Sequence, residues 1–98
     1  MEINKELKGT ELTVLLEGRL DTTSAPQLDK FLNEELDGVE SLIFDMIKLE
    51  YISSAGLRVL LSAQKKMNQV GTMTIKNAND DIKEVFDITG FSGILTIL

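Results

Sequence analysis

The sequence predicts an α/β fold, with a mixed, mostly parallel sheet of about five strands and three to four helices in the order β-β-α-β-α-β-α-β. Three observations lead to this prediction. The chain has 98 residues, 43% of them hydrophobic, which suits a single domain over residues 1–98 with its own core. Segments with strand periodicity alternate with segments of helical periodicity, which favours parallel strands joined by right-handed crossovers. The first two strand-like segments are instead joined by a short turn, which makes the sheet mixed.

The chain opens with a predicted β-hairpin. Apolar and polar residues alternate near residues 3–7, and a turn signal around Gly9 follows. Residues 11–17 form a second apolar-rich segment, so the two strands are expected to pair directly. Gly18 is expected to end the second strand.

The first helix is expected around Pro26, which belongs in a first helical turn. Ser24 and Gln27 have capping-box spacing, but a residue before proline avoids helical angles, so Ala25 is an alternative N-cap. Gly38 is expected to close the helix. The core-facing stripe of this helix has i, i+3, i+4, i+8 spacing and consists of Leu28, Phe31, Leu32 and Leu36.

The remainder of the chain continues the alternation of strands and helices. The expected elements are a buried strand over residues 41–45, a helix from Ser53-Ser54 to Gly71, a strand over 72–76, a helix from Asn79 to Gly90 and a strand over 94–97. Asn79 is a favourable N-cap, and the two glycines are favourable helix stops.

Composition and charge exclude several classes of function. The net charge is -6 and no cluster of Lys or Arg occurs, which argues against nucleic-acid binding. The chain has no Cys and no His, so thiol nucleophiles, zinc sites and His-based acid–base catalysis are excluded. We therefore expect no metal and no cofactor. Because no apolar run has the length of a signal peptide or a membrane span, we expect a cytoplasmic protein without membrane insertion.

Three segments are expected to meet at one edge of the sheet, because function gathers at the carboxyl ends of parallel strands. They are the loop over residues 18–24, Asp45 at the end of the third strand, and Ser53–Gly56 at the start of the second helix.

Ser53 and Ser54 have two interpretations. A serine at a helix start commonly caps the helix by accepting a backbone N–H. The free N–H groups and positive dipole of a helix start also stabilise a phosphate. Gly56 favours a functional role, because glycine in a helical turn costs up to about 1 kcal/mol and suggests a close approach to the backbone. One serine can cap while the other is modified.

The acidic residues have structural and chemical alternatives. Asp21 can organise the turn before the first helix, and Asp45 can hold a loop amide. A receiver-like domain phosphorylated on Asp45 requires an acidic pair after the first strand and a lysine near the last strand, and neither is present. A serine hydrolase is disfavoured because no histidine is available to activate Ser54.

Four motifs resemble the STAS domain family, in the right order and over essentially the whole chain. They are Gly18-Arg-Leu-Asp21, Phe44-Asp-Met46, Tyr51-Ile-Ser-Ser-Ala-Gly-Leu-Arg-Val-Leu-Leu61 and Val85-Phe-Asp-Ile-Thr-Gly-Phe91. More narrowly, the chain resembles bacterial anti-sigma factor antagonists. In aligned members Ser53 is often Asp, Ala55 is often Ser or Thr, and Ile47 is often polar.

This resemblance implies a binding protein without catalysis of its own. An unphosphorylated antagonist of this family binds an anti-sigma factor that is also a serine kinase of the histidine-kinase-like ATPase type, which frees the sigma factor. Phosphorylation breaks that complex, and a PP2C-type phosphatase restores it. The family phosphoserine falls on Ser54, with Ser53 as second choice.

The resemblance also implies a partner-binding surface, with Asp45 as a supporting acid at the same edge. This surface comprises Asp21, Thr22, Thr23, Ser53, Ser54, Ala55, Gly56, Leu57 and Arg58. The alternative function is a non-phosphorylated STAS interaction subunit of a transporter or stress-signalling complex.

Overall fold

A computed structural model describes residues 1–98 and has the expected order of elements. These are β1 (Glu2–Lys8), β2 (Glu11–Leu20), α1 (Ala25–Glu35), β3 (Ser41–Ile52), α2 (Ser54–Val70), β4 (Thr72–Lys76), α3 (Asp80–Thr89), a short 3-10 helix (Phe91–Gly93) and β5 (Thr96–Ile97). The predicted α/β fold with five strands is therefore confirmed.

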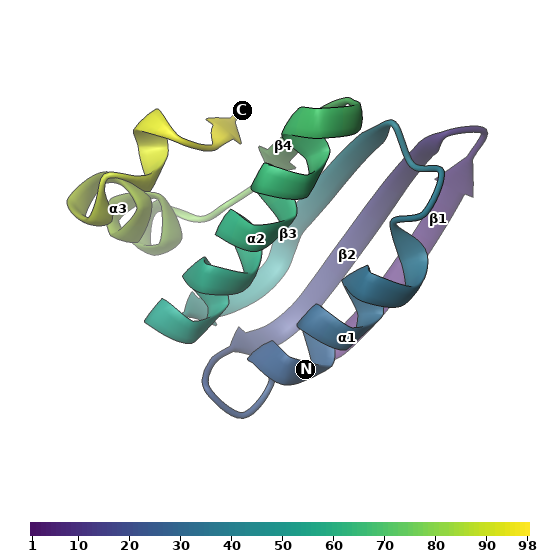
Figure 1. Ribbon diagram of the computed structural model, residues 1–98. Helices are drawn as coiled ribbons and strands as arrows, with labels where there is room; N and C mark the ends of the chain where they lie inside the picture. Colours follow the sequence, from purple (N-terminus) through teal and green to yellow (C-terminus); the bar gives the residue numbers. More distant parts are fainter.

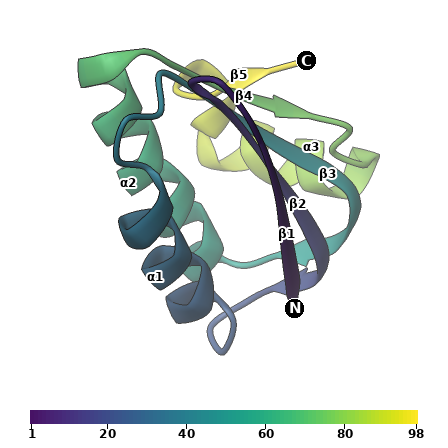
Figure 2. The ribbon, with the colours of Figure 1, turned by 90° about the vertical axis from the view of Figure 1, so that its right-hand side faces the viewer.

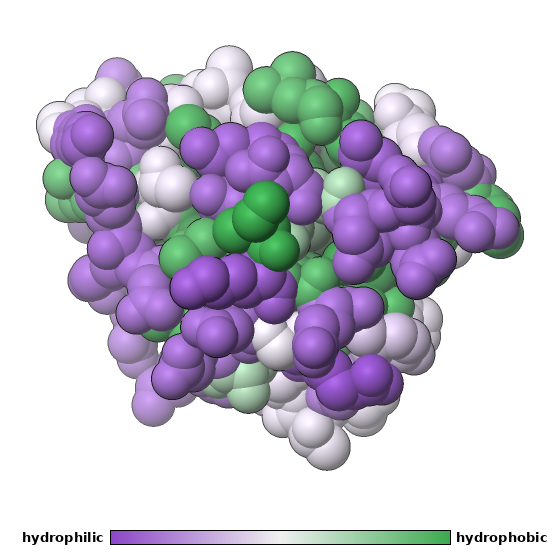
Figure 3. Space-filling model, turned by 180° about the vertical axis from the view of Figure 1, so that it is seen from behind, coloured by the Kyte–Doolittle hydropathy of each residue, from purple (hydrophilic) through white to green (hydrophobic).

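The five strands form one sheet in the order β1-β2-β3-β4-β5. β1 pairs with β2 in antiparallel fashion, and every later neighbouring pair is parallel. Helices α1 and α2 lie side by side over one face of the sheet. Helix α3 lies on the other side of α2 from α1 (Figures 1 and 2). Seen from behind, the molecule is mainly hydrophilic, with hydrophobic groups near the centre and at the top (Figure 3).

The core lies between the sheet and the helices. Alternate residues of the strands point into it and are 2% exposed or less: Leu12, Val14, Leu16, Leu42, Phe44, Met46, Met73 and Ile75. They pack with Leu28 of α1 and Leu60 of α2 in one continuous hydrophobic cluster. Strands of period two and helices of period 3.6 thus present their apolar sides to one another.

The third strand is much longer than the sequence indicated. β3 continues past Asp45 to Ile52, so the expectation that this strand ends at Asp45 is wrong. The extension pairs with the end of β2, where Glu17 lies opposite Lys48. β4 pairs only with residues 41–45 of β3, so residues 46–52 extend beyond it.

The second strand is also longer than predicted. β2 runs to Leu20, and Gly18 lies inside it rather than at its end. The register with β3 shifts between Gly18 and Arg19, and Gly18 has a φ of 103°, which favours glycine at an irregularity of this kind.

The start of α1 lacks the predicted capping box. Ser24 is the N-cap residue, but its side chain accepts no hydrogen bond from the first turn. Its hydroxyl instead donates to the carbonyl oxygen of Arg19 at 2.7 Å. Gln27 does not reach back to Ser24, because its amide donates to the carbonyl oxygen of Met1 at 3.1 Å. Other predicted boundaries are close to the observed ones.

Candidate functional site

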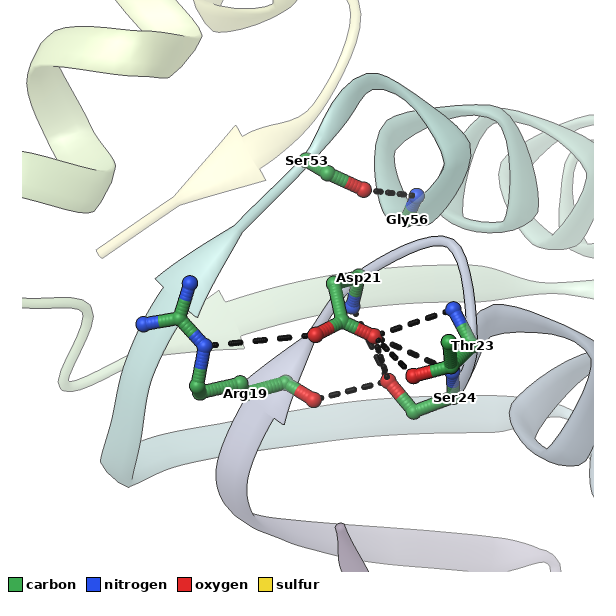
Figure 4. A network of polar contacts seen from close by, with 6 residues as sticks. All are labelled: Arg19, Asp21, Thr23, Ser24, Ser53 and Gly56. Carbon is green, nitrogen blue, oxygen red and sulfur yellow. Dashed lines mark hydrogen bonds and ion pairs between the residues drawn. The ribbon is translucent and has the colours of Figure 1, made fainter.

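The start of α2 is joined to the end of β2 by a backbone hydrogen bond. The N–H of Ser53 donates to the carbonyl oxygen of Leu20 at 2.9 Å. Asp21 follows Leu20 and Ser54 follows Ser53, so the loop after β2 and the first turn of α2 form one edge of the molecule (Figure 4). This confirms that the topology brings the loop and the helix start together.

The two neighbouring serines have different environments. Ser53 is the N-cap of α2, with extended backbone angles, and its half-buried side chain accepts the N–H of Gly56 at 3.5 Å (Figure 4). Ser54 is the first residue of the helix and is exposed, and its hydroxyl makes no hydrogen bond within the chain. One serine therefore caps the helix, and the neighbouring hydroxyl is free.

Two residues of the predicted partner-binding surface are buried. Leu57 is 4% exposed and belongs to the core, and Gly56 is also buried. A Cβ atom at Gly56 would lie 2.6 Å from Cγ of Leu20. The close approach suggested by this glycine is therefore made by the protein itself. Because Gly56 and Leu57 are buried in the core, they are not part of the exposed surface at this edge.

Asp21 organises the turn between β2 and α1. Its Oδ1 accepts from the backbone N–H of Thr23 at 3.0 Å, the hydroxyl of Thr23 at 2.7 Å and the N–H of Ser24 at 3.2 Å (Figure 4). The bond from the Thr23 hydroxyl contributes most to lowering the pKa of Asp21 below its ordinary value, followed by the Ser24 amide. Asp21 thus carries a fixed negative charge beside the helix start.

Arg19 and Tyr51 add a feature that the predicted surface did not include. They lie opposite each other in the β2–β3 register, and the guanidinium carbon of Arg19 is 4.2 Å from the centre of the Tyr51 ring. Nε of Arg19 is 3.9 Å from Oδ2 of Asp21 (Figure 4). Tyr51 is 41% exposed. The pairing of a basic and an aromatic residue becomes visible only once the strand register is known.

An open groove of about 390 Å³ runs between α1 and α2 from this edge. Three predicted surface residues line it: Thr22, Ala55 and Arg58. The other lining residues are Ala25, Pro26, Asp29, Val59 and Ser62, none of which the sequence predicted to belong to the site. The lining combines apolar residues with one acid and one base, Asp29 and Arg58, which form no ion pair with each other.

Asp45 is absent from this edge, contrary to expectation. Asp45 is seven residues before Ile52, which at about 3.3 Å per residue corresponds to roughly 23 Å of strand. Asp45 accepts from the N–H of Ile47 at 3.1 Å and from the side-chain amide of Asn77 at 3.0 Å, and Lys76 lies 3.9 Å away. Through its bond to Asn77, Asp45 holds the turn after β4. Asn77 has a left-handed φ of 61° in this turn.

The acidic residues do not assemble a metal site, since no group of three or more His, Cys, Asp or Glu side chains is placed to hold an ion. None of the helices combines the length and apolar character that a membrane span requires.

Comparison with known proteins identifies the family. A family model described as the STAS domain matches residues 2–98. The chain belongs to the STAS domain family. The resemblance in the four sequence motifs is thereby confirmed.

Relatives of this STAS domain carry names of one kind. BtrV of Bordetella bronchiseptica, named as a candidate anti-sigma factor antagonist, is 36% identical over 88 residues, which cover 88% of this chain and 76% of BtrV. The anti-sigma-B factor antagonist of Bacillus subtilis is 30% identical over 100 residues, covering 99% and 92% of the two chains. These names describe regulators rather than enzymes.

A solved structure with the same fold is the Bacillus cell fate determinant SpoIIAA in its phosphorylated form. It has a TM-score of 0.77 and 18% sequence identity, and the match covers 99% of this STAS domain and 91% of SpoIIAA.

Proposed function

We propose that this STAS domain is an anti-sigma factor antagonist controlled by phosphorylation of Ser54. Its unphosphorylated form binds an anti-sigma factor that is also a serine kinase with a histidine-kinase-like ATPase fold, and the sigma factor is released. Phosphorylation of Ser54 ends that binding, and a PP2C-type phosphatase reverses the modification. These partners act in the cytoplasm. The names of BtrV and of the Bacillus subtilis protein support this proposal.

The observation that carries the proposal is the free hydroxyl of Ser54 beside an occupied N-cap. A kinase needs a hydroxyl that it can reach and that the fold does not require. Ser54 meets both conditions, whereas Ser53 is half-buried and oriented toward Gly56. Modification of Ser54 leaves the cap of α2 in place.

The position is suited to a phosphate on physical grounds. The first turn of a helix has free N–H groups and a partial positive charge, which stabilise an anion there. Phosphorylation adds about -1.5 to -2 charges. Asp21 already holds a negative charge at the same edge, so the phosphate increases the local negative density. An acidic partner surface is then repelled, and an apolar one is disfavoured because it would have to desolvate the phosphate, in both cases without a change of fold.

The proposed binding surface consists of the exposed and half-buried residues of this edge. Its members are Asp21, Thr22, Thr23, Ser53, Ser54, Ala55 and Arg58, to which the structure adds Arg19 and Tyr51. The groove between α1 and α2 opens onto the same edge. A partner side chain that enters the groove contacts Ala55 and Arg58, which lie close to Ser54 in the first two turns of α2.

Phosphate mapping tests the site. The kinase is first isolated by affinity capture on the unphosphorylated chain, and the chain is then incubated with it and ATP. Mass spectrometry is expected to find one phosphate on Ser54 in the wild type and in Ser53→Ala, and none in Ser54→Ala. Phosphate that persists in Ser54→Ala would refute the assignment.

Binding measurements test the switch itself. The variant Ser54→Asp is expected to bind the captured kinase more weakly than Ser54→Ala, and Gln69→Glu, exposed near the opposite end of α2, is the charge control. A partner that binds permanently, and that never transfers phosphate to the chain, would favour the alternative of a non-phosphorylated interaction subunit.

A further inference from the structure

Strand β1 forms a free edge of the sheet. It pairs with β2 on one side and is the outermost strand on the other. Figure 2 looks onto this edge, and no helix or strand lies in front of β1. A free edge leaves unpaired backbone N–H and C=O groups that a further strand can bind.

The hairpin turn fixes which residues present those free groups. Lys8 and Glu11 flank the two-residue turn, whose first residue, Gly9, has a φ of 62°. In such hairpins the flanking pair exchanges both hydrogen bonds, and the bonding then alternates along the strand. The backbone groups of Ile3, Lys5 and Leu7 therefore point away from β2.

Charged residues on an edge strand normally prevent pairing, and β1 is rich in them. We infer that β1 nevertheless has one partner, the β1 strand of a second copy of this chain. In an antiparallel pair with Lys5 opposite Lys5, the outward-pointing backbone groups of both strands meet. Glu2 then lies opposite Lys8 of the second copy, and Ile3 lies opposite Leu7.

Neighbouring registers are electrostatically unfavourable. Backbone hydrogen bonding allows the register to shift only by steps that keep the outward-pointing residues opposite one another. One such shift places Glu2 opposite Glu6, and the other places Glu6 opposite Glu6. Like charges directly opposite destabilise a strand pair, so the charge pattern selects the register centred on Lys5.

The charges on β1 of a single chain are complementary to those of a second copy in this register. Glu2 lies opposite Glu17 of β2 and has no ion-pair partner of its own. Lys8 of the second copy, which lies 3.3 Å from Glu6 of its own chain in an exposed ion pair, supplies the missing cation. The repulsion between the two Lys5 side chains is reduced, because each Lys5 lies 2.7 Å from Glu35 of α1 in its own chain.

Apolar side chains complete the contact on the helix-covered face. Leu7 is 61% exposed, and Ile3 is half-buried. Phe31 is half-buried and lies on the side of α1 that faces β1, because it is four residues from both Gln27 and Glu35. These two residues contact Met1 and Lys5, respectively. Two copies of this apolar strip meet across the two-fold axis.

The pairing leaves the phosphorylation edge accessible. Ser54 begins α2, which contacts β3 and β4 rather than β1. The inference therefore does not depend on the proposed function, and each dimer presents two separate switch edges.

Solution mass and amide exchange test the pairing. Light scattering over a range of concentrations is expected to show a mass approaching twice that of the chain. Hydrogen exchange by NMR is expected to slow at Ile3, Lys5 and Leu7 as concentration rises. Asn4 and Glu6 serve as internal controls, because their amides face β2 at every concentration. A monomer up to millimolar concentration, or exchange at Ile3, Lys5 and Leu7 that does not change, would overturn the inference.

Charge reversal tests the register. Glu2→Lys and Lys8→Glu each create repulsion in both halves of the symmetric pair, and each is expected to weaken self-association about tenfold. An equimolar mixture of the two variants places opposite charges at every such position and is expected to form a heterodimer. NMR fingerprints of the separate variants establish that both are folded. Dimerisation of each variant alone at wild-type strength, or no heterodimer from two folded variants, would refute the register.

Discussion

Leu20 holds the start of α2 through both its backbone and its side chain. Its carbonyl oxygen accepts the N–H of Ser53 at 2.9 Å, and its Cγ lies 2.6 Å from the position of a Cβ atom at Gly56. These contacts fix the first turn of α2 against the end of β2. Ser54 is therefore presented by a rigid element, although its own side chain is free.

Gly56→Ala is expected to destabilise the protein. The added methyl group would contact Leu20 and Ile52 at 3.0 Å or less, and overpacking of this kind costs about 1–3 kcal/mol. The better helix propensity of alanine offsets up to about 1 kcal/mol of that cost. Urea unfolding measures the difference. Gly93→Ala is the control, since nothing lies within 4 Å of its Cβ position and it should leave stability almost unchanged.

The two serines are expected to differ in their effect on stability. Ser53→Ala removes the N-cap of α2 and should cost about 0.5–1 kcal/mol, at the low end for a cap because the bond to Gly56 is long. Ser54→Ala removes an exposed hydroxyl without a partner and should change stability by less than about 0.5 kcal/mol. Urea unfolding of both variants checks this order. A larger loss for Ser54→Ala would show that its hydroxyl has a structural role.

The pKa of Asp21 is expected to lie below its ordinary value of 3.8 in the folded protein. A carboxyl group with a lowered pKa stabilises the fold above its unfolded pKa. That contribution is lost as pH falls from 3.8 through the folded pKa. NMR titration of the carboxyl group measures the shift directly.

Thr23→Val identifies the cause of that shift. It removes the side-chain hydrogen bond that lowers the pKa of Asp21 most, so the pKa should rise toward 3.8. Thr22→Val is the matched control, since Thr22 makes no hydrogen bond to Asp21. An equal change in the two variants would point to a general effect of the loop.

Asp45→Ala is expected to separate stability from the switch. The variant loses the hydrogen bonds that hold Ile47 and Asn77, with a cost of about 1 kcal/mol. Phosphorylation of Ser54 should continue at the wild-type rate, because Asp45 lies far along β3 from the edge. Asp21→Ala, tested beside it, should weaken binding of the kinase. If folded Asp45→Ala lost binding, Asp45 would belong to the partner-binding surface after all.

The sequence predicted the elements that local patterns encode. Asn79 caps α3, β4 covers residues 72–76, and Gly71 ends α2, as expected. These features depend on periodicity and on residues with strong backbone preferences, both of which can be read within one short segment. The motif around Ser54 was likewise visible, because a helix start is a local feature.

The length of β3 was underestimated, because the predicted strand stopped at Asp45. Within residues 46–52 the charged residues Lys48 and Glu50 alternate with apolar ones and no Gly or Pro interrupts them, so the local pattern is compatible with a strand. They form a strand because the end of β2, far away in sequence, pairs with them. This extension moves Asp45 away from the edge that carries Ser54.

The sequence by itself determined the family, the order of strands and helices, and the presence of two serines at the mouth of α2. Only the tertiary structure decided which serine is free, which residues of the motif are buried, and where Asp45 lies. The reason is physical: periodicity depends on neighbours along the chain, whereas burial and strand length depend on partners that the fold brings together. Leu20 contacts both Ser53 and Gly56 for this reason, although more than thirty residues separate it from them.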